Sequence, residues 1–126
     1  MLCLLKHRLG AADKMNIETE SLDSGILKIS LAGRMDVQGA QEIDLKFNGY
    51  TANQRAVIVD MSAVDFLASI GIRTLLLVAK AISRRGGKMV VLNPDANVSH
   101  VLEMAGIDTL IPICRSLGEA RTAVSA

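Results

Sequence analysis

The hydrophobic pattern of this chain changes period near its centre, between residues 56 and 92. Residues 56–59 are apolar and mostly β-branched, a run that is too short for a helix and typical of a strand buried on both faces. Residues 60–68 show no sustained period and predict a loop, whereas from Ser69 apolar residues recur at helical spacing and predict one long helix. The Arg-Arg-Gly-Gly run at 84–87 ends that helix, because cations favour its negative end and glycine can adopt the left-handed cap. Residues 88–92 predict a second buried strand, so the centre forms a right-handed strand–helix–strand crossover with parallel strands.

The segment before this centre alternates with the period of strands. Residues 16–20 and 26–32 each alternate polar and apolar positions, and the Asp-Ser-Gly turn at 23–25 joins them into an antiparallel hairpin. Asp36 follows the second strand and is placed to cap a short helix that continues through Phe47.

The segment after the centre repeats the alternation of helix and strand. Asn93-Pro94 predicts a helix start with proline in the first turn, and Gly106 ends this helix. Residues 110–114 predict a short strand whose proline places it at a sheet edge, and the Ser-x-x-Glu pattern at 116–119 opens a last helix. With residues 49–53 as a loop before the centre, the order is β-β-α-β-α-β-α-β-α. This predicts an α/β fold with about five strands and about four helices, an antiparallel hairpin at its start and a parallel core.

Length and composition narrow the class of protein. At 126 residues the chain is large enough for one domain, which we place at 15–126, with residues 1–14 either a tail outside the fold or a short helix that docks on it. Only three residues are aromatic, so the core is expected to be aliphatic. A net charge of +1 argues against a nucleic-acid partner held by bulk charge.

The few chemically active side chains argue against an enzyme. Cys3 and Cys114 lie far apart without metal-like spacing, which suits a reducing cytosol, and His7 and His100 complete no ligand set with them. The apolar start is too short for a signal peptide or a membrane span, so we expect a cytoplasmic protein that does not insert into membranes. No nucleophile elbow, phosphate loop or dinucleotide motif is present, so we expect no catalysis and no cofactor.

Several segments together resemble a known family. They are Gly-Arg-Met-Asp at 33–36, Asp-Met-Ser at 60–62, Ala-Ser-Ile-Gly-Ile at 68–72, Gly-Gly at 86–87 and Leu-Glu-Met-Ala-Gly-Ile at 102–107. They resemble the signature of the STAS domain as found in bacterial anti-sigma-factor antagonists, and the resemblance extends roughly from Met15 to Ala126. It implies the STAS fold, with the mixed sheet described above.

The resemblance gives Ser69 a specific role. In the family, the serine at this position is phosphorylated by a partner that is both a GHKL-type serine kinase and an anti-sigma factor, and a metal-dependent serine phosphatase reverses the reaction. The unphosphorylated domain binds the kinase and frees the sigma factor. A helix N-terminus would also stabilise a phosphate electrostatically. By resemblance, the phosphorylation site is Ser69 and the partner-binding residues are Asp36, Ala68, Ser69, Ile70, Gly71, Ile72 and Arg73.

Other interpretations stay open at this point. Ser69 could simply be a helix cap worth about 1 kcal/mol, and Asp36 could likewise be only a helix cap. Because Ala68 and Ile70 replace the acid and the second hydroxyl of many family members, the chain could instead be an unphosphorylated STAS subunit of a membrane transporter, or a signalling module with a non-sigma output. Asp60 could be a receiver-type phosphoacceptor, although the acidic pair for magnesium is missing. Arg73, Lys80 and Arg84 share an outer helical stripe that could meet acidic groups of a partner or face solvent.

Overall fold

The computed structural model describes residues 15–125, so the predictions made for residues 1–14 lie outside the described residues. Its helices and strands follow the predicted order. They are β1 (Asn16–Ser21), β2 (Ile26–Met35), α2 (Val37–Thr51), β3 (Ala56–Leu67), α3 (Ser69–Arg84), β4 (Lys88–Leu92), α4 (Ala96–Met104), β5 (Ile113–Cys114) and α5 (Leu117–Ser125), with single 3-10 turns at Asp23–Gly25 and Ile107–Thr109.

The strands form one five-stranded mixed sheet in the order β1-β2-β3-β4-β5. β1 and β2 are antiparallel, with Asn16 opposite Ala32, and every other neighbouring pair is parallel. Ser24 and Gly25 have positive φ values, which let the chain reverse between β1 and β2. The predicted fold class, with its antiparallel hairpin and parallel core, is confirmed.

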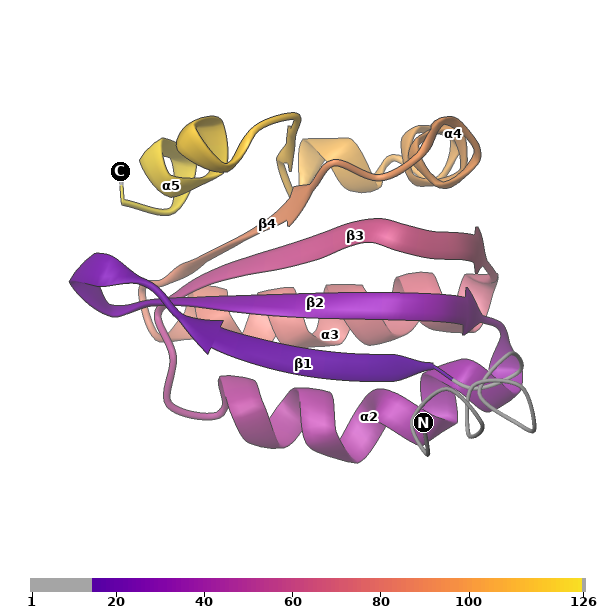
Figure 1. Ribbon diagram of the computed structural model, residues 1–126, viewed down its shortest axis with the longest axis horizontal. Coiled ribbons are helices and arrows are strands. Elements are labelled where there is room, and N and C mark those ends of the chain that lie inside the picture. The colour runs from indigo at the N-terminus through magenta and orange to yellow at the C-terminus, as the bar shows by residue number, and fades with distance from the viewer. Residues whose placement is uncertain (1–14, 126) are drawn as a thin grey trace, which may run out of the picture.

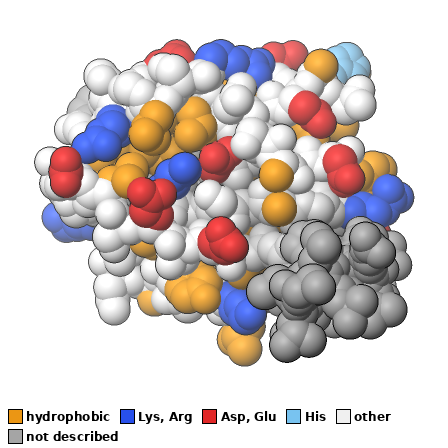
Figure 2. All heavy atoms as spheres, viewed as in Figure 1, with side chains coloured by type: hydrophobic (Ala, Val, Ile, Leu, Met, Phe, Trp, Pro, Cys, Tyr) orange, Lys and Arg blue, Asp and Glu red, His pale blue; other side chains and the backbone are white. Residues whose placement is uncertain are grey.

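Helices cover the sheet from both sides (Figure 1). Alternate residues of the central strands, such as Ile29 and Val59, join the larger hydrophobic cluster with residues of α2 and α3. The residues between them, such as Ile58 and Val90, form a smaller cluster with Ala120 of α5. Both clusters are aliphatic apart from Phe47. On the described part of the face drawn in Figure 2, acidic and basic side chains are interspersed, so this face carries no basic patch of the kind that holds a phosphate backbone.

The predicted loop at residues 60–68 is wrong, because β3 continues as a strand to Leu67 and pairs with an equally extended β2. Two register shifts, between Ser30 and Ala32 and between Gly33 and Arg34, each place one extra residue in β3. The inward-facing residues Met61, Val64 and Leu67 therefore recur every three positions instead of every two. The alternation that identifies a strand is lost for this reason.

Other boundaries also differ from the sequence prediction. The strand predicted at 110–114 is only Ile113–Cys114, because the preceding residues 107–109 form a 3-10 turn. α2 runs to Thr51, through most of the predicted loop at 49–53. α4 begins at Ala96 rather than at Asn93-Pro94, because the side chain of Asp95 caps it by accepting a hydrogen bond from the Val98 N–H at 2.8 Å. The last helix starts as predicted, since the Glu119 N–H donates to the Ser116 hydroxyl at 3.1 Å.

Candidate functional site

The carboxyl ends of β2 and β3 bring two helix starts to the same edge of the sheet. These strands run parallel and Met35 pairs with Leu67, so the residues that follow them, Asp36 and Ala68, leave the sheet side by side. The Ala68 N–H donates to the Met35 carbonyl oxygen at 3.0 Å and ties the two exits together. α2 begins after Asp36 and α3 after Ala68, so Asp36 and Ser69 lie at the starts of neighbouring helices.

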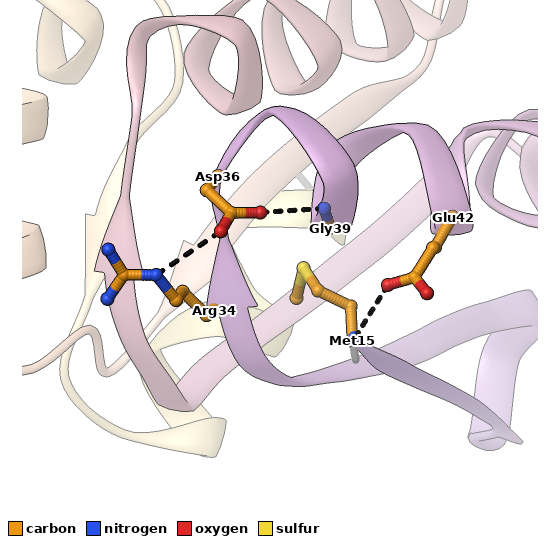
Figure 3. Close-up of polar contacts among 5 residues, drawn as sticks. All are labelled: Met15, Arg34, Asp36, Gly39 and Glu42. Carbon is orange, nitrogen blue, oxygen red and sulfur yellow. Dashed lines mark hydrogen bonds and ion pairs between the residues drawn. The ribbon is translucent and has the colours of Figure 1, made fainter. Parts of the chain in front are cut away.

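Asp36 is held in place by both of its carboxylate oxygens (Figure 3). Oδ1 accepts a hydrogen bond from the Gly39 N–H at 2.8 Å and caps α2, and Oδ2 accepts one from Arg34 Nε at 3.2 Å. The Gly39 N–H is the largest cause of a lowered pKa for this carboxyl, and Arg34 adds to it. Arg34 in turn stacks on Phe66, with its guanidinium carbon 4.1 Å from the ring centroid. Asp36 is thus the helix cap that the sequence predicted.

Two glycines let these helix starts approach the strands closely. A methyl group on Gly39 would overlap the carbonyl oxygen of Arg34, and one on Gly71 would lie 2.7 Å from Leu67 Cδ1 and 2.8 Å from Met35 Cγ. At α2 the chain is further fixed by a 3.3 Å hydrogen bond from the Met15 N–H to the Glu42 carboxylate (Figure 3). The absence of side chains at both glycines therefore sets how the two helices sit on the sheet.

Ser69 is exposed in the first turn of α3. The cap position belongs to Ala68, whose backbone is extended and whose side chain makes no capping hydrogen bond, so the interpretation of Ser69 as the cap is wrong. No side chain caps the start of α3. The Gly71 N–H donates to the Ala68 carbonyl oxygen at 2.9 Å, which leaves the N–H groups of Ser69 and Ile70 without a partner within the helix. Ser69 therefore lies at the positive end of the dipole of a 16-residue helix, in the turn that holds these two uncapped donors.

A shallow groove of about 300 Å³ lies beside this helix start, between α2 and α3. Exposed apolar side chains lie in it and near it: Leu77 is 54% exposed and Val37, at the start of α2, is 59% exposed. The groove is lined by Ala40, Gln41, Asp44, Ile70, Arg73, Thr74 and Leu77. Its lining combines apolar side chains with one acid and one base, a mixed composition that suits contact with another protein.

The predicted site residues differ in what they present to solvent. Ser69 and Arg73 are exposed, whereas Asp36, Ala68, Ile70 and Ile72 are half-buried and Gly71 is buried under the helix. Gly71 therefore shapes the site without offering a side chain. Arg73, Lys80 and Arg84 are all exposed on α3, and none of the ion pairs among residues 15–125 involves them.

Sequence reasoning missed the residues that surround the predicted site. Arg34 lies in the Gly-Arg-Met-Asp motif, but neither it nor Phe66 was predicted as a site residue, because their contact depends on the register shift that places them opposite each other. The α2 side of the groove was missed too, because residues 40–44 meet α3 only in the folded chain. One signal was available: Leu77 is a large apolar residue outside the buried stripe of α3.

Asp60 lies elsewhere, on the sheet. Its carboxylate pairs with Lys28 Nζ at 3.6 Å and accepts a hydrogen bond from the Ser62 N–H at 3.0 Å. Across residues 15–125 no three His, Cys, Asp or Glu side chains converge in a way that could hold a metal ion. Nor is any helix in that range long and apolar enough to span a bilayer.

Comparisons with known proteins agree with this fold. BtrV, a proposed anti-sigma factor antagonist of Bordetella bronchiseptica, is 26% identical over 110 residues, which cover 86% of this chain and 94% of BtrV. The crystal structure of an anti-sigma factor antagonist from Mycobacterium paratuberculosis superposes with a TM-score of 0.83 at 26% identity, covering 94% of this chain and all of that one. Murine Slc26a9, an anion transporter, shares the fold with a TM-score of 0.71 at 14% identity; 97% of this chain matches 24% of the transporter.

The family assignment rests on most of the chain. The sequence model of the STAS domain family matches residues 16–120, a range that contains all five strands of the described sheet and the start of α5. The resemblance to STAS-domain antagonists that the sequence motifs indicated is confirmed. The chain belongs to the STAS domain family.

Proposed function

We propose that this protein is a cytoplasmic anti-sigma-factor antagonist that acts by partner switching, with Ser69 as its phosphorylation site. The observation that carries the proposal is the exposed Ser69 hydroxyl at the uncapped start of α3, next to the groove between α2 and α3. The similarity to BtrV and to the Mycobacterium paratuberculosis antagonist over most of the chain supports the same class of partner.

A phosphate on Ser69 would be accommodated by the folded chain. The uncapped N–H groups of Ser69 and Ile70 can donate to its oxygens, and the helix dipole favours its charge of about −1.5 to −2. Arg73 lies one helical turn further on and is exposed, within the i,i+4 spacing at which opposite charges attract. Phosphorylation would therefore leave the fold intact and change the surface.

The same phosphate would oppose a bound partner. In the proposed complex the kinase covers Ser69, Arg73 and the groove beside them, where apolar residues such as Leu77 lie exposed. In such a contact the partner would remove the charged phosphate from water, and this desolvation cost weakens binding. The unmodified form would hold the kinase, and the phosphorylated form would release it.

The proposed partners follow from this cycle. They are a GHKL-type serine kinase that is also an anti-sigma factor, which brings its own ATP, and a metal-dependent serine phosphatase. The chain itself then needs neither cofactor nor metal, and its role is to bind rather than to catalyse.

The direct test is incubation of the purified chain with a candidate GHKL-type serine kinase from the same organism and ATP, followed by mapping of the phosphate by mass spectrometry. We expect one phosphate on Ser69, none in Ser69→Ala, and kinase binding weakened at least about tenfold in Ser69→Asp. Ser83→Ala is the matched control, because Ser83 is an exposed serine at the other end of the same helix. Phosphate at another residue, or unchanged binding by Ser69→Asp, would contradict the switch.

A second candidate function is an unphosphorylated STAS subunit of a membrane transporter. The fold shared with Slc26a9 favours it only at the level of architecture. Binding assays separate the two: under the first proposal the unmodified chain binds the kinase, and under the second it binds a transporter component and Ser69→Asp binds equally well.

A further inference from the structure

The far edge of the sheet is only partly closed. β5 pairs with β4 through two residues, Ile113 opposite Val91 and Cys114 opposite Leu92. The first half of β4, from Lys88 to Val90, has no strand beside it on that side among residues 15–125. A parallel strand next to this half would continue the sheet.

Pro112 explains why the chain leaves this half of β4 open. The Val91 N–H donates to the Pro112 carbonyl oxygen at 2.9 Å. In that register the carbonyl of Met89, two residues before Val91 in β4, faces the nitrogen of Pro112. Proline nitrogen carries no hydrogen, so it cannot donate to this carbonyl. The Lys88 N–H donates towards β3, to the Arg55 carbonyl at 2.7 Å, so the N–H and C=O of Met89 point the other way, to the side of β4 that no strand covers. Met89 is only 4% exposed, and a partner would reach it through the cavity that it lines.

A cavity of about 260 Å³ lies at this edge. Its walls are small side chains, Ala79 and Ser83 from α3 and Ala123 from α5, and Leu110, which is 63% exposed, lies at one end. Lys88 also lines it, is exposed, and takes part in none of the ion pairs among residues 15–125. We call this cavity the β4 groove.

We propose that the β4 groove binds an extended segment of a partner protein that carries an acidic side chain. The segment adds a short strand to β4, donating to the Met89 carbonyl and accepting from the Met89 N–H, while its acid pairs with Lys88. The stretch from Lys88 to Val90 spans roughly 10 Å at about 3.3 Å per residue, which is enough for three residues of the peptide. The small wall residues leave room for its side chains.

This surface is separate from the proposed phosphorylation site. Ser83, in the wall of the β4 groove, follows Ser69 by 14 positions in the same helix (83 − 69), which is roughly 21 Å at about 1.5 Å per residue. A protein bound at the β4 groove would therefore leave the Ser69 surface free. The two proposals can therefore fail independently, because a variant at Ser69 does not alter the β4 groove and a variant at the β4 groove does not alter Ser69.

The proposal is tested by selecting phage-displayed random seven-residue peptides on the full, unphosphorylated chain and titrating the best synthetic peptide. We expect an enriched peptide family with an acid at a fixed position. Its affinity should fall at least about tenfold in Lys88→Glu, which reverses the charge, and in Ser83→Leu, which fills the groove from an exposed position. Lys80→Glu and Ser69→Ala are the matched controls and should bind the peptide as the wild type does.

Hydrogen exchange supplies a readout that tests strand addition directly. Exchange of the Met89 amide should slow at least about tenfold on peptide binding, and N-methylation of the pairing amide in the peptide should abolish that effect. The proposal is overturned if no peptide family is enriched, if Lys88→Glu and Ser83→Leu bind normally, or if the Met89 amide is unaffected. It is equally overturned if Ser83→Leu disrupts a homodimer in sedimentation experiments, because a second copy would then occupy the groove.

Discussion

Gly39 offers the sharpest test of how the helix starts are positioned on the sheet. In Gly39→Ala the new methyl group would overlap the Arg34 carbonyl oxygen, which is backbone and cannot rotate away. The start of α2 must then move outward, which also weakens the 2.8 Å hydrogen bond from the Gly39 N–H to Asp36. We therefore expect a destabilised protein, although alanine is the better helix former.

The magnitude follows from three contributions. Overpacking at a rigid contact costs about 1–3 kcal/mol, and the weakened Asp36 cap adds to that cost. Alanine has a higher helix propensity than glycine, which offsets about 1 kcal/mol of this cost. The free energy of unfolding should therefore fall by about 1–3 kcal/mol.

The assay is urea unfolding followed by circular dichroism, and Gly49→Ala is the matched control. Gly49 lies in the same helix, and nothing lies within 4 Å of the methyl group that would be added. That variant should be stabilised by about 0.5–1 kcal/mol. If Gly39→Ala proves as stable as Gly49→Ala, the close approach of α2 to β2 is not the constraint described above. Kinase binding should weaken in Gly39→Ala and stay unchanged in Gly49→Ala, because only the first variant displaces the start of α2, which forms one wall of the groove between α2 and α3.

Three further predictions concern the pH dependence, the reactivity and the stability of the fold. The pKa of Asp36 is lower in the folded protein than in the unfolded chain, where it is about 4, so the ionised carboxylate stabilises the fold above about pH 4. This stability is lost as the pH falls through the folded pKa. In urea titrations the difference in unfolding free energy between wild type and Asp36→Asn should therefore shrink between about pH 7 and about pH 3. Burial raises the pKa of the Cys114 thiol and restricts access to it. In a Cys3→Ser variant, Cys114 should therefore react with Ellman's reagent at least about tenfold more slowly in the native protein than in urea. Equal rates would contradict its burial. Arg85→Ala should lower the free energy of unfolding in urea by roughly 2–3 kcal/mol, because Arg85 Nη2 donates to the carbonyl oxygens of Thr51 and Gln54 at 2.6 and 2.7 Å. The control Arg84→Ala removes an exposed side chain and should change the free energy of unfolding by less than about 0.5 kcal/mol.

The sequence by itself determined the elements whose signals are local. The helical period of α3, its Arg-Arg-Gly-Gly end and the Asp36 cap depend on residues within a few positions of one another, and they appear in the structure as predicted. The β1–β2 hairpin was predicted for the same reason. The position of Ser69 in the first turn of α3 also followed from the sequence.

Only the tertiary structure decided what depends on partners distant in the chain. The second half of β3 is a strand because β2 lies beside it, and the two extra residues that its bulges contain remove the alternation that would have revealed it. The contact of Arg34 with Phe66, the groove between α2 and α3, and the open edge at Met89 all arise where separate elements meet. Local periodicity reports which face of an element is buried, whereas strand register and helix packing are set by contacts that the linear pattern does not contain.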